Sequence, residues 1–267
     1  MAAKRTAKKQ AKRAKKPKKL MASARMKAAA KKSAARAVRG APIRKAAAGK
    51  GAAKKKAPEK FVLHGFFASL PSCKAGLMLS MSGAKWDYKH VDLMNGQQKT
   101  PEFGAMNRFA QVPVLKHGDR TICQSDTILW YIAQQTGKFG GRNEDEKLRI
   151  SEWMNWDLSD MAVGVGISRF INRMAPNTGQ ETRDFIRARG ERALSTLDRH
   201  LGTSKFLVGP APTIADIAIF PWVATAEEGG FNIANYPNVQ AWAERMLTFP
   251  GAAHPYKIMP KEDRAAA

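Results

Sequence analysis

The chain has 267 residues and carries 46 Lys or Arg against 22 Asp or Glu, for a net charge of +24. Most of this charge lies at one end, because residues 1–60 hold 23 basic residues and one acid, Glu59, whereas the other 207 hold 23 basic and 21 acidic residues. The chain contains no run of 18 apolar residues, the length that a membrane-spanning helix needs. Its two cysteines, Cys73 and Cys123, have neither a CxxC nor a metal-ligand spacing. We therefore expect a basic arm on a nearly neutral globular body, with reduced thiols, no metal and no membrane partner.

Residues 1–60 are predicted to be disordered, because they contain 20 Ala and no Phe, Trp or Tyr with which to form a core. Their lysines lie in blocks that suit phosphate backbones, with binding driven by released counterions and independent of base sequence. The lysines expected to contact nucleic acid or another polyanion are Lys15, Lys16, Lys18, Lys19, Lys31, Lys32, Lys54, Lys55 and Lys56. The composition resembles the Lys/Ala-rich tails of linker histones and bacterial histone-like proteins. The alternatives are an inert solubilising tail and an organelle-targeting peptide, and the 17 Lys against 6 Arg disfavour the second.

The first half of the body is predicted to alternate strands and helices. In chain order, the pattern predicts a strand at 61–67, a helix at 73–82, a strand at 86–93, a short helix near 100–104, strands at 112–115 and 121–123, and a helix at 124–135. Gly83 follows the first of these helices as a C-terminal stop signal. The resulting order is β-α-β-α-β-β-α.

Beyond a polar linker at 136–143, the chain is predicted to be helical. The helices are expected at 144–174, 180–201, 213–226 and 238–248. The third begins with a capping box in which Thr213 is the N-cap and Asp216 stands in for the usual Glu. An α/β segment followed by an all-helical segment indicates two domains, which we place at 61–137 and 144–258, after a disordered tail at 1–60.

Three motifs of the body resemble those of a known family. They are NRFAQVPVL at 107–115, QSDTILWYIA at 124–133 and TIAD at 213–216. The first matches the pattern N-x-x-G-x-V-P-x-L with Ala110 in place of Gly. The second matches E-S-x-A-I-x-x-Y-L-A with Gln124 in place of Glu and Thr127 in place of Ala. In this order and spacing they resemble the cytosolic glutathione S-transferases, over residues 61 to about 255. The resemblance implies a thioredoxin-like domain followed by an all-helical domain, in a homodimer.

The resemblance also implies which residues hold glutathione. They are Gln111, Val112, Pro113, Gln124, Ser125 and Asp126. In the family the proline is cis, and the backbone before it pairs with the cysteinyl part of glutathione. Ser125 opens a helix, whose N-terminus suits the γ-glutamyl carboxylate. Gln124 lacks the charge of the family's Glu, so that weaker glutathione affinity or a shifted ligand preference is expected. Asp126 is the candidate to supply the missing charge, in this site or in the neighbouring subunit's.

The partner of the glutathione sulfur is expected between the first strand and the first helix. A free thiol has a pKa of about 8.5, and a hydrogen bond to the thiolate lowers it. Ser69 is placed where serine- and threonine-type members carry their hydroxyl, with Ser72 and Cys73 as alternatives. Cys73 qualifies because a helix N-terminus lowers the pKa of a thiol, but a packed apolar thiol is the favoured interpretation of this residue. A tyrosine-type site is excluded, because the first strand contains no Tyr. A site without any catalytic hydroxyl is the remaining alternative.

Candidates for the walls of an apolar acceptor pocket between the domains are Trp153, Trp156, Phe170 and Trp222, but most of them are expected to be core, because aromatics at helical spacing usually are. The sequence therefore predicts a cytoplasmic glutathione S-transferase, which transfers alkyl or aryl groups and uses glutathione as co-substrate without a metal. It would conjugate glutathione to a hydrophobic electrophile or exchange thiol on a disulfide, and its tail would bind nucleic acid in the nucleoid or chromatin. The alternative is a non-catalytic scaffold of the same fold, associated with nucleic acid.

Overall fold

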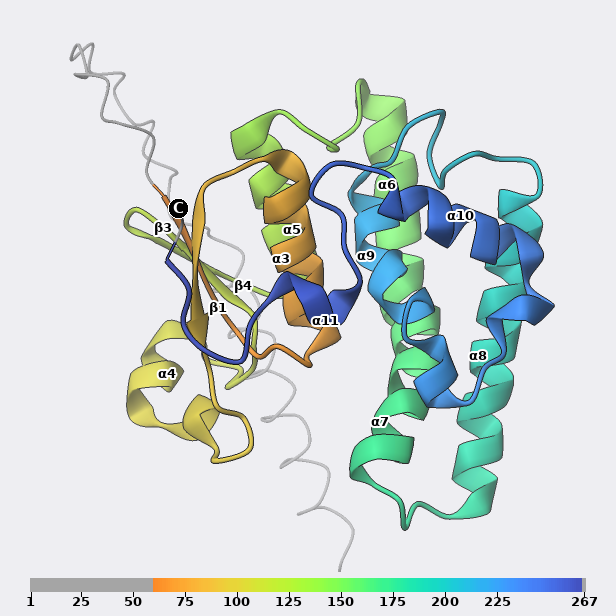
Figure 1. The fold of residues 1–267 in the computed structure, drawn as a ribbon, viewed down its shortest axis with the longest axis horizontal. Coiled ribbons are helices and arrows are strands. Elements are labelled where there is room, and N and C mark those ends of the chain that lie inside the picture. Colours follow the sequence, from red (N-terminus) through yellow and green to blue (C-terminus); the bar gives the residue numbers. More distant parts are fainter. Residues whose placement is uncertain (1–59, 266–267) are drawn as a thin grey trace, which may run out of the picture. The chain divides into compact units, whose positions relative to one another are not determined.

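The structure is a computed structural model that describes residues 60–265. The predictions for the basic arm, including its disorder and its nine polyanion-binding lysines, lie outside the described residues. The described part consists of a sheet with helices, followed by a purely helical part (Figure 1). The predicted fold class of the body, a thioredoxin-like domain before an all-helical domain, is thereby confirmed.

A four-stranded sheet forms the centre of the N-terminal domain. Its strands are β1 (Phe61–Gly65), β2 (Trp86–His90), β3 (Val114–His117) and β4 (Arg120–Cys123), in the order β2-β1-β3-β4. β1 runs parallel to β2 and antiparallel to β3, which pairs antiparallel with β4. Because alternate side chains of a strand point to opposite faces, Phe61 and Leu63 are buried under helices whereas Val62 and His64 face the other side.

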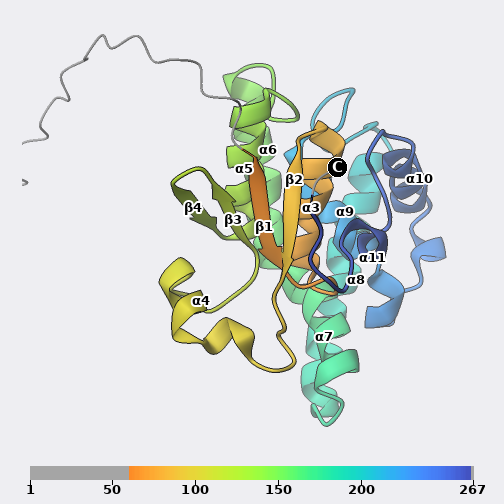
Figure 2. The same ribbon diagram turned by 60° about the vertical axis from the view of Figure 1, so that its left-hand side comes forward.

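Two helices separate the sheet from the helical domain: α3 (Leu70–Ser82) and α5 (Ser125–Thr136) (Figure 1). α3 begins at its N-cap Ser69 and ends at Gly83, whose φ of 70° is a left-handed conformation that favours glycine. The short elements η1 (Gln97–Lys99) and α4 (Pro101–Met106) lie on the side of the sheet away from α3 (Figure 2). The N-terminal domain is therefore layered, and its inner helices, α3 and α5, face the helical domain.

The helical domain is built around one fully buried helix, α9. Its elements are α6 (Glu144–Trp156), the π-helix η2 (Asp157–Gly166), α7 (Ile167–Met174), α8 (Gln180–Leu201), α9 (Ile214–Val223), η3 (Ala226–Gly229), η4 (Ile233–Asn235), α10 (Pro237–Leu247) and α11 (Pro255–Ile258). The predicted capping box is confirmed: the Asp216 carboxylate accepts the backbone N–H of Thr213 at 2.8 Å. Asp216 also accepts from the backbone of Leu207 and the indole of Trp242, each at 3.0 Å. One buried carboxylate thus joins three segments of the domain.

The region predicted to be helical at 144–174 is helical throughout, but its central ten residues, η2, have the wider turn of a π-helix between α6 and α7. Two glycines of η2 come very close to neighbouring helices. A Cβ on Gly164 would lie 2.5 Å from the Gly190 nitrogen in α8, and one on Gly166 would lie 2.8 Å from the Trp222 ring in α9. The wider helical turn therefore occurs where tertiary packing, rather than local propensity, sets the backbone path.

The predicted order β-α-β-α-β-β-α is confirmed, and α8 has the predicted bounds. Some other boundaries shift by a few residues. β1 ends at Gly65, two residues early, because the backbone turns there and the Ser69 N–H donates to the Phe66 carbonyl at 2.9 Å. α3 begins at Leu70, three residues before the predicted start, because Pro71 is tolerated in the first turn of a helix.

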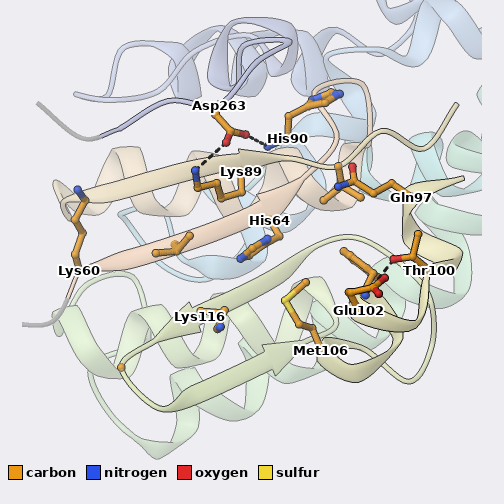
Figure 3. A pocket seen from close by; sticks show the side chains of 14 residues that line it. Lys60, His64, Lys89, His90, Gln97, Thr100, Glu102, Met106, Lys116 and Asp263 are labelled. Carbon is orange, nitrogen blue, oxygen red and sulfur yellow. Dashed lines mark hydrogen bonds and ion pairs between the residues drawn. The ribbon is translucent and has the colours of Figure 1, made fainter. Parts of the chain in front are cut away.

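After α11 the chain returns to the N-terminal domain as a segment that we name the C-terminal strap (residues 259–265). Tyr88 of β2 and Arg264 exchange two backbone hydrogen bonds of 2.7 and 2.9 Å. Asp263 accepts from the Lys89 ammonium and from the His90 backbone, both at 2.8 Å (Figure 3). The C-terminal strap is therefore fixed to the edge strand of the sheet.

Candidate active site

Two adjoining cavities open between the thioredoxin-like and helical domains. The first cavity has a volume of about 420 Å³ and the second of about 1160 Å³. The residues common to both walls are Ser69, Pro71, Leu93, Gln111, Ala162 and Trp222. Because the walls are shared, a molecule in the first cavity would lie beside a molecule in the second.

Asn107 shapes the loop that leads into β3 and forms one wall of the first cavity. It is buried, its Nδ2 donates to the Gln111 carbonyl at 2.6 Å, and its Oδ1 accepts a backbone N–H two residues further on at 3.0 Å. Ala110 has a φ of 51°, in the left-handed region where the family pattern has Gly. The Val112–Pro113 peptide bond is cis, as the resemblance implies. Gln111, Val112 and Pro113 all line the first cavity.

The N-terminus of α5 forms the next part of this wall, through Gln124 and Ser125. Gln124 is exposed and has a φ of 69°, outside the usual region for residues other than glycine. The Ser125 hydroxyl donates to Asp126 Oδ1 at 3.2 Å. Asp126 does not line the cavity, and its Oδ2 is buried with no hydrogen-bond partner among residues 60–265. Free N–H groups at the start of a helix suit an anionic group, so this wall can hold a carboxylate.

A buried charge cluster that we did not predict lies behind the first cavity. Lys74 of α3 lines the cavity, yet its side chain is only 1% exposed. Its ammonium contacts Asp157 Oδ2 of η2 and, at 3.5 Å, Asp126 Oδ1 of α5. Burial alone would lower the Lys74 pKa, but the two carboxylates outweigh it and raise the pKa. Burial raises the pKa of Asp157 to about 6, although Lys74 opposes the shift. The cluster joins both domains behind the Gln124–Ser125 wall.

Of the three candidates for the catalytic group, Ser69 alone reaches the cavities. Ser69 is the N-cap of α3, and its Oγ accepts the Ser72 N–H at 3.4 Å. Ser72 is fully buried and its own Oγ accepts the Phe66 N–H at 3.4 Å, away from both cavities. The Cys73 thiol is also buried, and burial raises its pKa to about 12. Cys73 is thus the packed apolar thiol that the sequence analysis favours, and the alternative, a thiol whose pKa the helix N-terminus lowers, is wrong because burial raises the pKa.

The second cavity has large apolar walls from both domains. They include Phe66, Phe67, Leu93, Met94, Ile167, Phe170, Met174 and Trp222. Phe170 and Trp222 thus lie where an acceptor pocket was expected. Trp153 and Trp156 do not: they line a separate cavity beside His200, where Trp153 contacts the His200 ring with centroids 4.7 Å apart.

A third cavity, of about 510 Å³, lies on the other face of the sheet (Figure 3). Its floor is His64 of β1, whose pKa is lowered by burial and by Lys116 and Lys89. Lys89 is paired with Asp263 at 2.8 Å, and Lys60 is paired with Asp87 at 2.7 Å. The groove is therefore largely neutralised, and Ser69 is not among the residues that line it.

Lys74 and Asp157 are the site residues that sequence reasoning missed. Lys74 does carry a signal, because it is the only Lys, Arg, Asp or Glu between Phe61 and Ala84. A lone charge in an apolar helix indicates a buried ion that needs a partner. Asp157 carries no comparable signal, since another acid, Asp160, lies one turn away. The predicted glutathione residues lie together around one cavity, with Asp126 behind its wall.

Within residues 60–265, no group of three or more His, Cys, Asp or Glu is arranged to hold a metal ion. The helices of this part of the chain are all too short or too polar to cross a membrane.

Comparisons with known proteins agree with this geometry. The model of the glutathione S-transferase N-terminal domain matches residues 59–134, and that of the C-terminal domain matches residues 180–245. The disulfide-bond oxidoreductase YfcG of Escherichia coli K12 is 28% identical over 194 residues, which are 69% of this chain and 90% of YfcG.

Solved structures give the same result. A glutathione S-transferase from Pseudomonas fluorescens Pf-5 superimposes with a TM-score of 0.70 at 27% identity, over 73% of this chain and 98% of that one. A second transferase-family member from the same strain, solved with two glutathione bound, has a TM-score of 0.66 at 25% identity, over 73% and 91%. With both domain models in order and the fold in agreement, the chain belongs to the glutathione S-transferase family.

Proposed function

We propose that glutathione binds in the first cavity and reacts there with a substrate held in the second. The observation that carries this proposal is the position of Ser69, a helix N-cap in the wall that both cavities share. A thiolate beside Ser69 would face the large apolar cavity, so that nucleophile and electrophile would be held next to each other.

The walls of the first cavity match the parts of glutathione. Gln111, Val112 and the cis Pro113 offer backbone groups for the cysteinyl residue. The N-terminus of α5, with Gln124 and Ser125, would hold the γ-glutamyl carboxylate. Asp126 would supply negative charge for the γ-glutamyl ammonium, in this site or in the neighbouring subunit's. The solved relative with two glutathione bound supports glutathione as the ligand.

The Ser69 hydroxyl would donate a hydrogen bond to the glutathione sulfur, and so would favour the thiolate over a thiol with a pKa of about 8.5. In conjugation, a sulfur lone pair forms a bond to an electrophilic carbon while the leaving group departs with its bonding electrons. In thiol exchange, the thiolate attacks one sulfur of a disulfide and the other sulfur leaves as a thiolate. The name of the E. coli relative, a disulfide-bond oxidoreductase, supports the second reaction.

The test uses the full chain with glutathione and two substrates. 1-Chloro-2,4-dinitrobenzene reports conjugation by absorbance, and the mixed disulfide of glutathione and 2-mercaptoethanol reports exchange through coupled NADPH oxidation. We expect turnover of at least one. If neither reacts and calorimetry shows no glutathione binding, the scaffold without catalysis becomes the better description.

We also propose that residues 1–60 bind nucleic acid or another polyanion without sequence preference. The 23 basic residues and single acid of this segment support the proposal. Such binding would place the enzyme in the nucleoid or on chromatin. Fluorescence anisotropy of a labelled duplex should show affinity that falls steeply with salt and disappears on deletion of residues 1–57. Binding that survives the deletion would contradict the proposal.

We further propose a homodimer, and a boundary between the thioredoxin-like domain (61–137) and the helical domain (144–258) in the linker between them. The family resemblance supports the dimer, and the break between α5 and α6 supports the boundary. Light scattering coupled to gel filtration, repeated at several protein concentrations, measures the oligomeric state.

A further inference from the structure

The second cavity combines an apolar body with a cationic rim. Three of its apolar side chains are unusually exposed for their size: Met94 at 69%, Phe170 at 55% and Met174 at 54%. Its charged wall residues are Arg169, Arg173 and Lys261 against one acid, Asp92. An exposed apolar wall of this kind is typical of a ligand site, and the charges decide which ligands it prefers.

Asp92 is engaged in its own turn rather than with these cations. Its Oδ1 accepts the backbone N–H groups of Met94 and Asn95 at 3.0 and 3.1 Å, and its Oδ2 accepts the Asn95 amide at 2.6 Å. These bonds, from the Asn95 side chain first, lower the Asp92 pKa and keep the group ionised without using a cation. Asp92 therefore does not neutralise the two arginines and the lysine of the rim.

Glu228 balances one of the two arginines. Arg169 Nε and Arg173 donate to the same Glu228 oxygen, at 2.9 and 2.8 Å. The Tyr256 hydroxyl donates to the other oxygen at 2.5 Å. One carboxylate thus serves two guanidinium groups, which leaves this part of the rim with a net positive charge.

Lys261 has no carboxylate within 4 Å among residues 60–265. Its closest charge-related contact is the face of Phe67, with the ammonium 5.4 Å from the ring centroid. Phe67 also lines the second cavity, so the ammonium lies at the rim and over an apolar wall. A cation placed in this way is available to an anionic group of a bound molecule.

The C-terminal strap fixes the position of Lys261. Two residues further on, Asp263 binds Lys89 and the backbone of His90 (Figure 3). The next residue, Arg264, pairs with Tyr88. The same strap therefore anchors to β2 and presents Lys261 to the cavity. His90, which also lines the cavity, contacts the Tyr88 hydroxyl through Nδ1 at 3.2 Å and is not a competing anion.

We propose that Lys261 is a specificity-determining residue, which selects acceptor substrates that carry an anionic group, such as a carboxylate, on an apolar body. This inference rests on the proposed function, since it concerns the substrate of the same site. The rim arginines contribute to the same preference, but they are partly neutralised by Glu228. Substitution of Lys261 removes one positive charge from the rim without breaking an ion pair among the described residues.

The test compares 4-chloro-3,5-dinitrobenzoate with its methyl ester. In both, the glutathione thiolate forms a C–S bond at the carbon that bears chlorine, the ring accepts the electron pair, and chloride leaves as the C–Cl bond breaks. Each kcat/KM is divided by the uncatalysed second-order rate constant, so that the different reactivity of the two rings cancels. We expect the wild type to prefer the benzoate by this measure.

Lys261→Gln should lower the normalised kcat/KM for the benzoate about threefold, as expected for an exposed charge pair, and leave the ester unchanged. Lys257→Gln is the matched control, because Lys257 is also exposed and lies on α11 but lines neither of these two cavities. It should change neither substrate. Addition of 0.5 M NaCl should remove the benzoate preference of the wild type, because salt at this concentration screens exposed charges.

An equal loss on both substrates in Lys261→Gln would overturn the proposal, because it would indicate a role in shape and not in charge. A benzoate preference as large in Lys261→Gln as in the wild type would overturn it as well. Turnover of the ester by the wild type tests the proposed function separately. The dissociation constants of the two product conjugates, measured by calorimetry on the same variants, give the same comparison independently of turnover.

Discussion

The two cavities that meet at Ser69 are built in opposite ways. Buried polar groups hold the walls of the first: Asn107 fixes the loop before β3, and Lys74 ties α3 and α5 to η2. The walls of the second are largely apolar, and three of their side chains, Met94, Phe170 and Met174, are more than half exposed. A wall held by buried hydrogen bonds accepts one ligand geometry, whereas an apolar wall tolerates many shapes. The difference suits an enzyme with one constant and one variable substrate.

The largest effect is expected from breaking the charge cluster behind the first cavity. Lys74→Met leaves Asp157 and Asp126 buried without their cation, and should lower the free energy of unfolding by about 3–5 kcal/mol. Urea denaturation followed by tryptophan fluorescence measures it. Lys85→Met, at an exposed position, is the control and should leave the midpoint unchanged. A loss no larger than that of the control would show that the cluster does not hold the wall.

Ser69→Ala removes the only candidate hydroxyl that reaches both cavities. We expect kcat/KM for 1-chloro-2,4-dinitrobenzene to fall about 100-fold, the usual cost of one hydrogen bond to a reacting anion. The pKa of the pH–rate profile should rise towards about 8.5, the value of a free thiol.

Two variants accompany this measurement. Ser69→Thr keeps the hydroxyl and should retain most activity, whereas Ser72→Ala should retain activity because Ser72 faces neither cavity. Activity lost in Ser72→Ala and kept in Ser69→Ala, at equal thermal stability, would assign the role to Ser72.

The pH dependence of stability should report on Asp157. Its pKa is raised by burial to about 6 in the folded chain, above the usual 3.8. An acid with a raised folded pKa favours folding most below its unfolded pKa, and this contribution is lost as pH rises through about 6. The free energy of unfolding of the wild type, relative to Asp157→Asn, should therefore increase by about 1 kcal/mol between pH 7 and pH 5. A flat difference across this range would contradict the assignment.

The smallest effect is expected from a variant that strengthens glutathione binding in the first cavity. Gln124→Glu introduces a charge beside the N-terminus of α5, where it can accept from the γ-glutamyl ammonium. A charge-assisted bond is roughly twice as strong as a neutral one, so glutathione should bind about fivefold tighter by calorimetry. Ser125→Ala should weaken binding in the same assay. Unchanged or weaker affinity in Gln124→Glu would mean that this end of the ligand lies elsewhere.

Much of the fold follows from local pattern. Apolar alternation places β1 and β2, Gly83 marks the end of α3, and Thr213 with Asp216 marks the start of α9. These signals act within a few residues of each other, so a sequence read segment by segment contains them. The spacing of the motifs also predicts that Gln111 and Gln124 lie at one cavity, but this prediction comes from the family resemblance and not from local physical patterns alone.

The features that escaped prediction depend on contacts between distant segments. Asp157 meets Lys74 across 83 positions, and the Cys73 thiol lies against the Pro255 carbonyl across 182. Burial by such partners, not position at the helix start, decides the Cys73 pKa. The π-helix η2 has the same origin, since Gly164 fits against Gly190 of another helix. Local periodicity contains no information on which surface a helix will meet.

The C-terminal strap has a consequence for solubility. β2 is the last strand of the sheet on its side, and an open strand edge can pair with another chain. Arg264 occupies both backbone groups of Tyr88 at the middle of that edge, and Asp263 takes the N–H of His90 next to it. Truncation after residue 259 would leave this strand edge unpaired and so promote aggregation. The last residues of the C-terminal strap therefore protect the protein against non-specific self-association.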